Sequence, residues 1–425
     1  MKYIRFICCL LVLIFALSAC ASGKESSAPA KSDDRVESSS PTTPPSSVES
    51  EASEKSDQQI ASSPFPSASA ENTPTSDSSA SLAPSNDPLS EDEQFLAGVT
   101  YRHYELTGES TPYFVGRWYK QTLYNYRHMV TTNSGSMLYF MVKDAPTMEV
   151  NFTLITDNEV PYYAYSIDGG TPVRRSITEP TVKLPDTGRH TVRIITEGIH
   201  EHVGKWSEEK GYAFKNIELP EGGEILGIKP KEKIVFFYGD SITEGINAIG
   251  ASGYGDSHSA TNAYPWYCSE KLGVTLYNIG YGATGLINTG SFNTMLAAID
   301  RMTNKRLVSM DITPDVIVIN HGHNDQYYGE LQMKSALQKT MNRLRKKYPD
   351  VPIVYMIPFN QAHAALITEF MSTIENSYVI QTKGWNLSMT EGVHPNPAGA
   401  KKAGEKLADE MLNIFGEDYF KEYPN

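Results

Sequence analysis

The hydrophobic and polar residues of this chain alternate with two different periods, and each period marks one region. In the first region, apolar and polar positions alternate in short runs: Met137–Val142, Met148–Leu154, Tyr162–Ile167 and His190–Ile195. Turn sequences rich in Asp and Gly separate these runs, and no long helical pattern lies between them. Short alternating strands with frequent turns predict a β-sandwich, which we place at residues 93–228.

The second region has a different period. Apolar runs that are typical of buried strands, such as Ile234–Tyr238 and Val316–Asn320, alternate with helical stretches such as Glu330–Lys347 and Pro397–Phe415. The other predicted strands are Val274–Ile279, Ile353–Ile357 and Tyr378–Gln381. Alternation of strands and helices predicts a mostly parallel sheet with helices on both faces. We therefore predict an α/β domain over residues 229–425.

The N-terminus has the pattern of a targeting segment. Lys2 and Arg5 precede an apolar run from Ile7 to Leu17, which is too short for a stable transmembrane helix and is typical of a secretory signal. The run ends in Leu-Ser-Ala before Cys20, which resembles the bacterial lipobox. That resemblance implies a lipoprotein signal over residues 1–20, with lipid such as palmitate on Cys20 and a chain anchored at the outer surface of the cell membrane. A plain secretory signal is the alternative.

Residues 21–92 are dominated by Ser, Pro, Ala, Thr and acidic residues. Such a composition cannot bury enough apolar surface to offset the entropy lost on ordering. We predict a disordered tether. A flexible chain of about 70 residues has a root-mean-square reach on the order of 45 Å, which suits an enzyme held above a membrane.

Charge and cysteine content narrow the picture further. The formal net charge of −13 argues against nucleic acid as a partner, because an acidic surface repels phosphate. The four cysteines are Cys8, Cys9, Cys20 and Cys268. The first two leave with the signal and Cys20 would carry lipid, so Cys268 stands alone and no intramolecular disulfide is expected. We predict that Cys268 is a small buried hydrophobic residue.

The strongest chemical signal is the heptapeptide Gly239-Asp-Ser-Ile-Thr-Glu-Gly245, which directly follows a predicted strand. A serine at the carboxyl end of such a strand, entering a helix, faces the crevice where open α/β sheets bind ligands. A serine hydroxyl needs a base to become a good nucleophile. Ser241 is therefore a candidate nucleophile, and the alternative is that it only caps the next helix.

Two later stretches favour catalysis. The sequence His321-Gly-His-Asn-Asp325 ends a later predicted strand, and Asn324 in it is a neutral donor suited to a developing oxyanion. The sequence Glu391-Gly-Val-His394 precedes the last predicted helix, and His394 is the natural general base.

Two other patterns suggest different chemistry. Gly280 to Gly285 spells G-x-G-x-x-G after a strand, with Asp300 about 20 residues on, as in dinucleotide-binding sites. That strand is the second of its domain, and the pattern leaves the serine, asparagine and histidine stretches unexplained. His200 and His202 could share a strand face, but they lack a third metal ligand, and a solvated loop is our prediction. We expect no metal and no cofactor.

The serine, asparagine and histidine blocks, in this chain order, together resemble the SGNH/GDSL hydrolase family. The resemblance covers about residues 231–415 and implies a flavodoxin-like, three-layer α/β domain. It implies that Ser241 is the nucleophile and His394 the base. It further implies that the Ser241 and Gly282 backbone N–H groups and the Asn324 side chain form the oxyanion hole, with Gly280 as the reserve for Gly282.

This sequence departs from the family pattern at one position. The family usually has Asp three residues before the histidine, where it orients the imidazole, and here the residue is Glu391. Its longer side chain could still reach His394. The alternative is a Ser–His dyad in which a backbone carbonyl orients the ring, and the sequence leaves the two open.

A β-sandwich that precedes an SGNH domain resembles carbohydrate esterase family two, whose N-terminal module is a jelly roll. This resemblance implies a serine esterase that removes acyl groups, acetyl above all, from extracellular poly- or oligosaccharides without a cofactor. Two alternatives stay open: a non-catalytic, carbohydrate-binding surface lipoprotein, and a lipase or thioesterase that acts on a non-carbohydrate ester.

Overall fold

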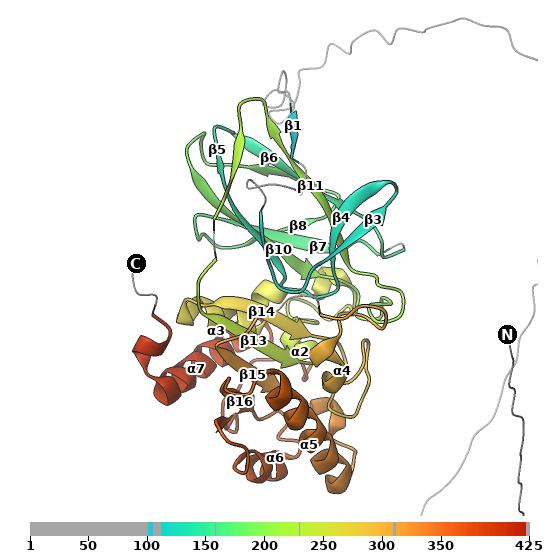
Figure 1. The fold of residues 1–425 in the computed structure, drawn as a ribbon, viewed down its shortest axis with the longest axis vertical. Helices are drawn as coiled ribbons and strands as arrows, with labels where there is room; N and C mark the ends of the chain where they lie inside the picture. The colour runs from blue at the N-terminus through green and yellow to red at the C-terminus, as the bar shows by residue number, and fades with distance from the viewer. Residues whose placement is uncertain (1–100, 105–111, 158, 229, 309–311, 422–425) are drawn as a thin grey trace, which may run out of the picture. The chain divides into compact units, whose positions relative to one another are not determined.

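The computed structural model describes residues 101–104, 112–157, 159–228, 230–308 and 312–421 (Figure 1). The predicted signal, Cys20 and the predicted tether over residues 21–92 lie outside the described residues. Within the described residues, no helix is both long and apolar enough to cross a bilayer.

Two antiparallel sheets form the first region. One has the strand order β3-β4-β11-β6-β9 with β1 beside β11, and the other has β12-β5-β10-β7-β8 with β2 beside β5. The first sheet contains β1 (Tyr101–Tyr104), β3 (Tyr119–Leu123), β4 (Tyr126–Thr131), β6 (Thr147–Thr153), β9 (Thr181–Lys183) and β11 (Tyr212–Pro220). The second contains β2 (Tyr113–Val115), β5 (Met137–Lys143), β7 (Tyr162–Ile167), β8 (Val173–Ser176), β10 (His190–Gly198) and β12 (Glu224–Gly227).

The alternating pattern of the sequence explains how these sheets pack. In β5, Leu138, Phe140 and Val142 are fully buried, while the residues between them are partly exposed. These three side chains join Val192 and Ile194 of the neighbouring β10 in one hydrophobic cluster between the sheets. The prediction of a β-sandwich is therefore confirmed.

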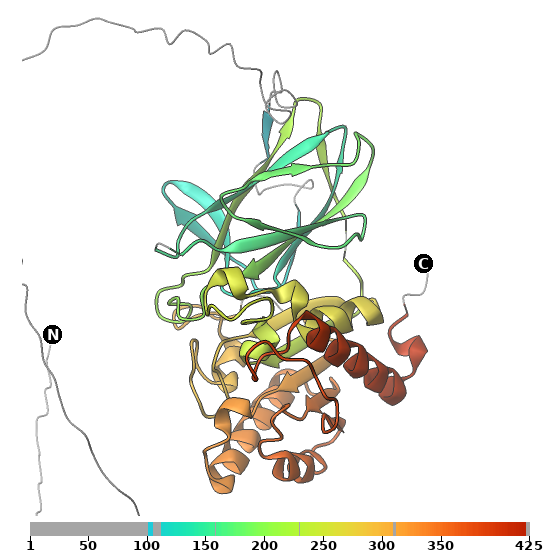
Figure 2. The same cartoon turned by 180° about the vertical axis from the view of Figure 1, so that it is seen from behind.

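The second region is a parallel sheet with the strand order β14-β13-β15-β16-β17, which is the flavodoxin-like order. Its strands are β13 (Ile234–Gly239), β14 (Thr275–Gly280), β15 (Val316–Asn320), β16 (Ile353–Met356) and β17 (Ser377–Ile380). Its helices are α2 (Ser241–Glu244), α3 (Tyr264–Leu272), α4 (Met295–Asp300), α5 (Glu330–Lys347), α6 (Ala364–Met371) and α7 (Pro397–Phe415). Helix α3 packs on α7, and α5 packs on α4 and α6, so helices cover both faces (Figures 1 and 2). The predicted three-layer α/β fold is confirmed.

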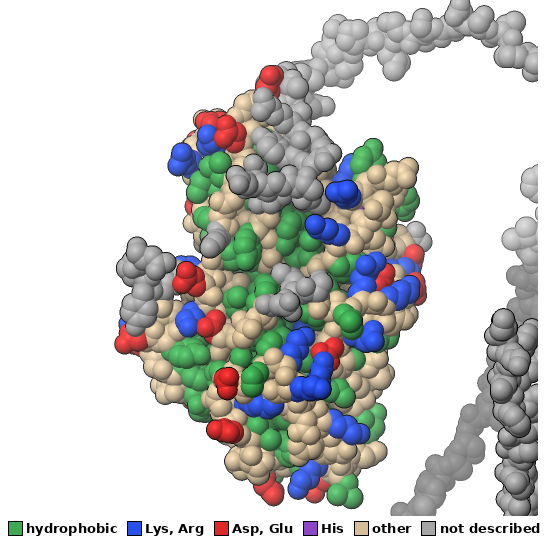
Figure 3. All heavy atoms as spheres, in the orientation of Figure 1, with side chains coloured by type: hydrophobic (Ala, Val, Ile, Leu, Met, Phe, Trp, Pro, Cys, Tyr) green, Lys and Arg blue, Asp and Glu red, His purple; other side chains and the backbone are tan. Residues whose placement is uncertain are grey.

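Burial explains the apolar runs of this sheet. Every residue of β14 and β15 is buried, because both faces are covered. Helix α5 instead buries one stripe, formed by Met333, Leu337, Met341 and Leu344. Its other side is polar, and Figure 3 shows Lys and Arg side chains gathered on the face of the molecule that α5 crosses in Figure 1.

The two regions are joined through a continuous interface. Val115, Met137 and Ile195 of the sandwich belong to the same hydrophobic cluster as the core of the α/β domain. Arg117, which is buried, donates to the carbonyl of Ala298 at 2.5 Å and to the hydroxyl of Tyr238 at 2.9 Å. The sandwich is thus fixed to the domain that carries the predicted catalytic residues.

A β-bulge strengthens this joint. The register between β10 and β7 shifts between Thr196 and Gly198. Such a shift re-aims the residue between them, which is the buried Glu197. Its carboxylate accepts hydrogen bonds from the Ser259 hydroxyl and from the N–H and hydroxyl of Thr261, the last two at 3.0 and 2.6 Å. A sandwich carboxylate thereby holds a loop of the α/β domain.

Candidate active site

The residues predicted to carry chemistry lie at one edge of the parallel sheet. Ser241 follows β13, Gly282 follows β14 and Asn324 follows β15, while His394 lies shortly before α7. The carboxyl ends of parallel strands meet at the same edge of a sheet, which is where open α/β folds bind ligands. The topology therefore brings together residues that are far apart in the chain.

Close packing makes the turn at Ser241 possible. A Cβ atom on Gly239 would collide with the side chain of Thr243, so only glycine fits there. Asp240 caps helix α2, because its Oδ1 accepts from the N–H of Ile242 at 3.0 Å. The cap is therefore Asp240, and Ser241 is free of that role. As the first helical residue, Ser241 has an N–H with no acceptor inside the helix.

Ser241, His394 and Glu391 form a hydrogen-bonded chain. His394 Nε2 lies 2.8 Å from Ser241 Oγ, and His394 Nδ1 contacts Glu391 Oε1. With the proton on Nδ1, the ring donates to the carboxylate of Glu391, and Nε2 accepts from the hydroxyl of Ser241. This arrangement is that of a catalytic triad, so the longer glutamate side chain reaches the ring.

Asn247, which the sequence analysis did not single out, holds this carboxylate from the other side. Its Nδ2 donates to Glu391 Oε1 at 3.2 Å. Partial desolvation raises the pKa of Glu391, but the hydrogen bonds from His394 and Asn247 outweigh it, and the pKa is below its usual range. Glu391 is therefore ionised beside His394 at neutral pH. No sequence pattern marks Asn247, because its partner lies 144 residues away.

Asn324 lies between the serine block and the loop after β14. Its Nδ2 is 3.1 Å from the carbonyl of Thr284 and 3.3 Å from Asp240 Oδ2. The buried carboxylate of the next residue, Asp325, accepts from the backbone N–H groups of Leu286, Ile287 and Asn288 at 2.7 to 3.0 Å. Asp325 therefore organises the loop that carries Gly282.

The N–H of Gly282 is directed at a carboxylate. It donates to Glu244 Oε2 at 2.8 Å, and Glu244 Oε1 forms an ion pair with the ammonium of Lys205. Lys205 is fully buried and Glu244 is 2% exposed. Burial raises the pKa of Glu244, and Lys205 opposes this shift. The role of Gly282 as a donor in the oxyanion hole stays a prediction. The same holds for Gly280, the last residue of β14, which was the second candidate for that role.

The segment around His200 and His202 is a loop, as predicted, and two side chains of this loop are held against the α/β domain. Lys205 is buried against Glu244. A Cβ atom on Gly282 would lie 2.7 Å from Glu201 Cδ, so the Glu201 side chain lies directly on Gly282. His202 is exposed. The period of the sequence could not reveal these contacts, because they depend on how the sandwich docks.

Two further imidazoles lie near His394. The pKa of His258 is lowered to about 3, mainly by burial and in smaller part by the charges of Lys205, His200 and His394. Burial also lowers the pKa of His323, with a smaller contribution from His394. Both rings therefore stay neutral at physiological pH, and His394 is the ring in contact with Ser241.

The dinucleotide interpretation finds little in its favour. Asp300, which would bind a ribose, instead accepts from Arg343 Nε and Nη2 at 2.5 and 2.6 Å. In the part of the chain that is described, no group of three His, Cys, Asp or Glu side chains is arranged to hold a metal ion. Cys268 is free and buried, as predicted.

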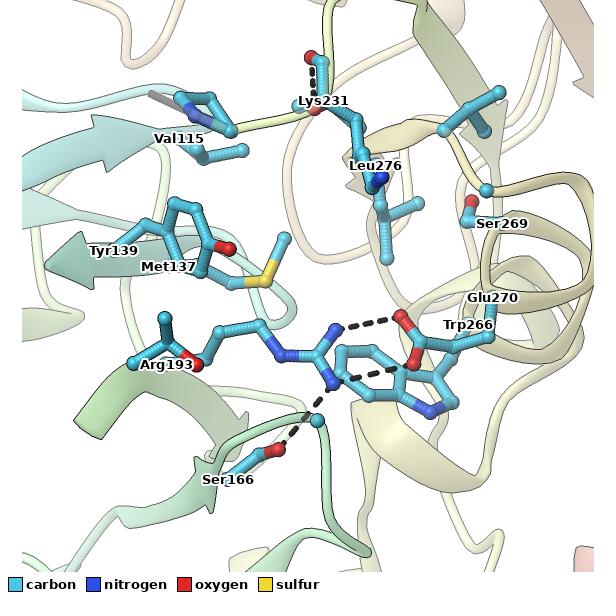
Figure 4. A pocket seen from close by; sticks show the side chains of 16 residues that line it. Val115, Met137, Tyr139, Ser166, Arg193, Lys231, Trp266, Ser269, Glu270 and Leu276 are labelled. Carbon is cyan, nitrogen blue, oxygen red and sulfur yellow. Dashed lines mark hydrogen bonds and ion pairs between the residues drawn. The ribbon is translucent and has the colours of Figure 1, made fainter. Parts of the chain in front are cut away.

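A cavity of about 250 Å³ lies elsewhere, between the sandwich and the amino-terminal end of β14. Figure 4 shows Arg193 of the sandwich reaching across it to Glu270 and Ser166, with the ring of Trp266 beside the guanidinium. Trp266 is buried there in the domain interface. Since Ser241 lies at the opposite, carboxyl end of the strands, this cavity is not part of the triad.

Comparison with known proteins identifies the α/β domain. Residues 237–402 match the GDSL-like Lipase/Acylhydrolase family. No curated protein sequence matches the chain. The matched range contains Ser241, Asn324, Glu391 and His394, so the triad lies within the matched domain.

Solved structures resemble both regions together. A family two carbohydrate esterase from Cellvibrio japonicus is 15% identical over 76% of this chain and 99% of its own, with a TM-score of 0.60. An active-site mutant of a family two carbohydrate esterase from Clostridium thermocellum is 19% identical over 72% and 98%, with a TM-score of 0.59. An acetyl xylan esterase from Butyrivibrio proteoclasticus is 16% identical over 75% and 99%, with a TM-score of 0.57.

These comparisons support two statements. The order of β-sandwich and α/β domain is the one in these solved structures. The chain carries a GDSL-like acylhydrolase domain and is a carboxylic ester hydrolase.

Proposed function

We propose that this carboxylic ester hydrolase removes acyl groups, acetyl above all, from carbohydrate through a Ser241–His394–Glu391 mechanism. The observation that carries the proposal is the hydrogen-bonded chain from the Ser241 hydroxyl through His394 to Glu391. A nucleophile, a base and an orienting carboxylate in that order are what acyl transfer requires.

Each residue has one task in this mechanism. His394 takes the proton of Ser241, whose oxygen attacks the ester carbonyl, and the ionised Glu391 stabilises the imidazolium that forms. The Asn324 side chain and the backbone N–H of Ser241 stabilise the oxyanion, and Gly282 adds its N–H as its bond to Glu244 lengthens. His394 then protonates the leaving sugar oxygen, which departs as a free hydroxyl. A water molecule gives its proton to His394 and attacks the acyl-enzyme, and His394 returns that proton to the Ser241 oxygen as the carboxylic acid is released.

The carbohydrate part of the proposal is supported by the solved structures of similar fold. They include carbohydrate esterases of family two, one of them in complex with cellohexaose, and an acetyl xylan esterase. At under 20% identity these structures share the fold with this chain, so the substrate is our inference.

A second candidate is non-catalytic carbohydrate binding. One similar structure is of a carbohydrate esterase whose active site is described as displaying divergent catalytic and non-catalytic binding functions. The contact between Ser241 and His394 favours catalysis here, because a binding surface needs no such pair.

Hydrolysis assays would test the proposal. The chain without its first 92 residues should release acetate from acetylated xylan and p-nitrophenol from p-nitrophenyl acetate. Rates should fall as the acyl chain of p-nitrophenyl esters lengthens. Fast cleavage of long-chain esters and none of acetylated glycans would favour a lipase instead, and binding of glycans without any hydrolysis would favour the non-catalytic candidate.

We further propose that Cys20 is lipidated and anchors the chain at the cell surface. The support is the sequence around Cys20, which resembles a lipobox. Mass spectrometry of the mature N-terminus should find a diacylated or triacylated Cys20 in the membrane fraction. A soluble chain with a free N-terminus beyond Cys20 would contradict the anchor.

A further inference from the structure

The β-sandwich contributes a loop to the active site. This loop joins β10 to β11 and covers residues 199–211. Its position is fixed by the buried ion pair between Lys205 and Glu244, and by the bonds of Glu197 at the end of β10 to Ser259 and Thr261. Because both anchors are buried, the side chains between them are held beside the site.

Glu201 lies within this loop and directly on Gly282. A Cβ atom built on Gly282 would be 2.7 Å from Glu201 Cδ and closer still to Glu201 Oε1 and Cγ. The charge of Glu201 also contributes to raising the pKa of Asp240, next to the nucleophile, for which burial is the main cause. The first observation places the Glu201 side chain against the loop of the predicted oxyanion hole, and the second puts its charge within electrostatic reach of Asp240, the neighbour of Ser241.

The carboxylate of Glu201 has no hydrogen-bond or ion-pair partner among the described residues, and it is partly exposed. An ionised carboxylate only accepts hydrogen bonds, with about four acceptor positions. A carboxylate that packs on the loop of the predicted oxyanion hole therefore offers a place for a donor on the bound substrate.

His200, the residue before Glu201, stacks on an aromatic ring of the α/β domain. The ring of His200 stacks on Tyr254 with 5.0 Å between centroids and an interplanar angle of 21°. Tyr254 is 51% exposed. The adjacent Gly253 donates its N–H to Asn247, the residue that holds Glu391, so this aromatic pair lies on the rim of the triad. Partly exposed rings beside a carboxylate suit the apolar face and the hydroxyl groups of a sugar.

We infer that Glu201 determines substrate specificity by accepting a hydrogen bond from a free hydroxyl of the sugar that carries the ester. The inference rests on the proposed carbohydrate esterase function and narrows its substrates. They are partly acylated, uncharged carbohydrates with a free hydroxyl near the ester. Anionic sugars bind poorly, because their carboxylates would meet Glu201.

The test compares three esters that differ in free hydroxyl groups: a monoacetylated methyl xyloside, the fully acetylated methyl xyloside and p-nitrophenyl acetate. Glu201→Gln, made in the full chain, keeps the size of the side chain and removes its charge. It should lower kcat/KM for the monoacetate by about tenfold, mainly through KM, because the neutral amide oxygen accepts a weaker hydrogen bond than a carboxylate does. The loss for the other two esters should be at least several-fold smaller.

The control is Glu208→Gln, which removes a negative charge from an exposed position of the same loop. It should leave kcat/KM for all three esters as in the wild type. Glu201→Ala should repeat the pattern with a larger loss, at an unchanged unfolding temperature.

Equal losses of Glu201→Gln for all three esters would overturn the inference and leave the esterase assignment intact. So would an unchanged kcat/KM for the monoacetate. A wild-type chain that cleaves p-nitrophenyl acetate but neither sugar ester would overturn the carbohydrate assignment, and the inference with it. A wild-type chain that cleaves none of them would overturn the proposed esterase function itself.

Discussion

The β-sandwich and the α/β domain use burial in opposite ways. In β5 of the sandwich, buried and partly exposed residues alternate, whereas in β14 and β15 of the α/β domain every residue is buried. A strand that is covered on both faces is mostly apolar, and its few polar side chains, such as Asn278 of β14, hydrogen-bond inside the protein and do not reach the substrate. The triad residues and Asn324 accordingly lie just beyond strand ends or in loops.

The sandwich takes part in the site by other means. Glu197 reaches the α/β domain from a β-bulge, and Glu201 and Lys205 do so from one loop. The α/β domain therefore supplies the reacting groups, whereas the sandwich holds and lines the site with a β-bulge and a loop.

Removing the nucleophile should abolish the esterase activity that the α/β domain supplies. Ser241→Ala should lower kcat for p-nitrophenyl acetate by about 10⁴-fold or more, because no other group replaces the attacking oxygen. Circular dichroism and thermal unfolding should match the wild type. Activity within a few-fold of the wild type would show that Ser241 is not the nucleophile.

Breaking the buried ion pair should uncouple the two regions. Lys205→Met leaves the buried charge of Glu244 without its partner, and we expect a loss of about 3–5 kcal/mol in the free energy of unfolding. Denaturant titration would measure it.

A double variant shows how much of this loss comes from leaving the charge of Glu244 unpaired. Lys205→Met with Glu244→Gln removes both charges and should recover part of the lost stability. Lys210→Met, which breaks the ion pairs of another lysine of this loop with the exposed carboxylates of Asp157 and Glu208, is the matched control and should change stability little. A destabilisation by Lys205→Met no larger than that of the control would contradict the coupling.

The asparagine tests the oxyanion hole. Asn324→Ala should reduce kcat by about 10²–10³-fold with a smaller effect on KM, as expected for a donor that acts in the transition state. Steady-state kinetics with p-nitrophenyl acetate would separate the two parameters. A change in KM alone would assign Asn324 to substrate binding.

The carboxylate at position 391 should have the smallest of these effects. Glu391→Gln keeps the size of the side chain and removes the charge that stabilises the imidazolium, so kcat should fall by about ten- to hundredfold. The pKa of Glu391 is lowered, so its ionised form persists below the usual carboxyl range. The difference between variant and wild type should therefore hold at neutral pH and shrink only as Glu391 itself becomes protonated.

An unchanged kcat and an unchanged acidic limb of the pH profile would instead favour a Ser–His dyad. A loss equal to that of His394→Ala would show that Glu391 is as important as the base.

The sequence predicted the elements that local periodicity encodes. Helices α5 and α7 have the predicted bounds because each buries one stripe of its surface. Strands β7 and β15 also have the predicted bounds, and β15 is an unbroken apolar run that is buried throughout. The serine, asparagine and histidine blocks were also visible, since each follows a predicted strand or precedes a predicted helix. The choice between a dyad and a triad was not, because it depended on whether the longer Glu391 side chain would turn toward His394.

The sequence by itself determined two regions, their fold classes and the positions of Ser241, Asn324 and His394. Only the tertiary structure decided which residues surround them: Asn247 on Glu391, Lys205 on Glu244 and Glu201 on Gly282. Each of these contacts joins different elements, and two of them join different domains. Local patterning reports which face of a strand or helix is buried, whereas the partner of a polar side chain depends on how whole domains dock.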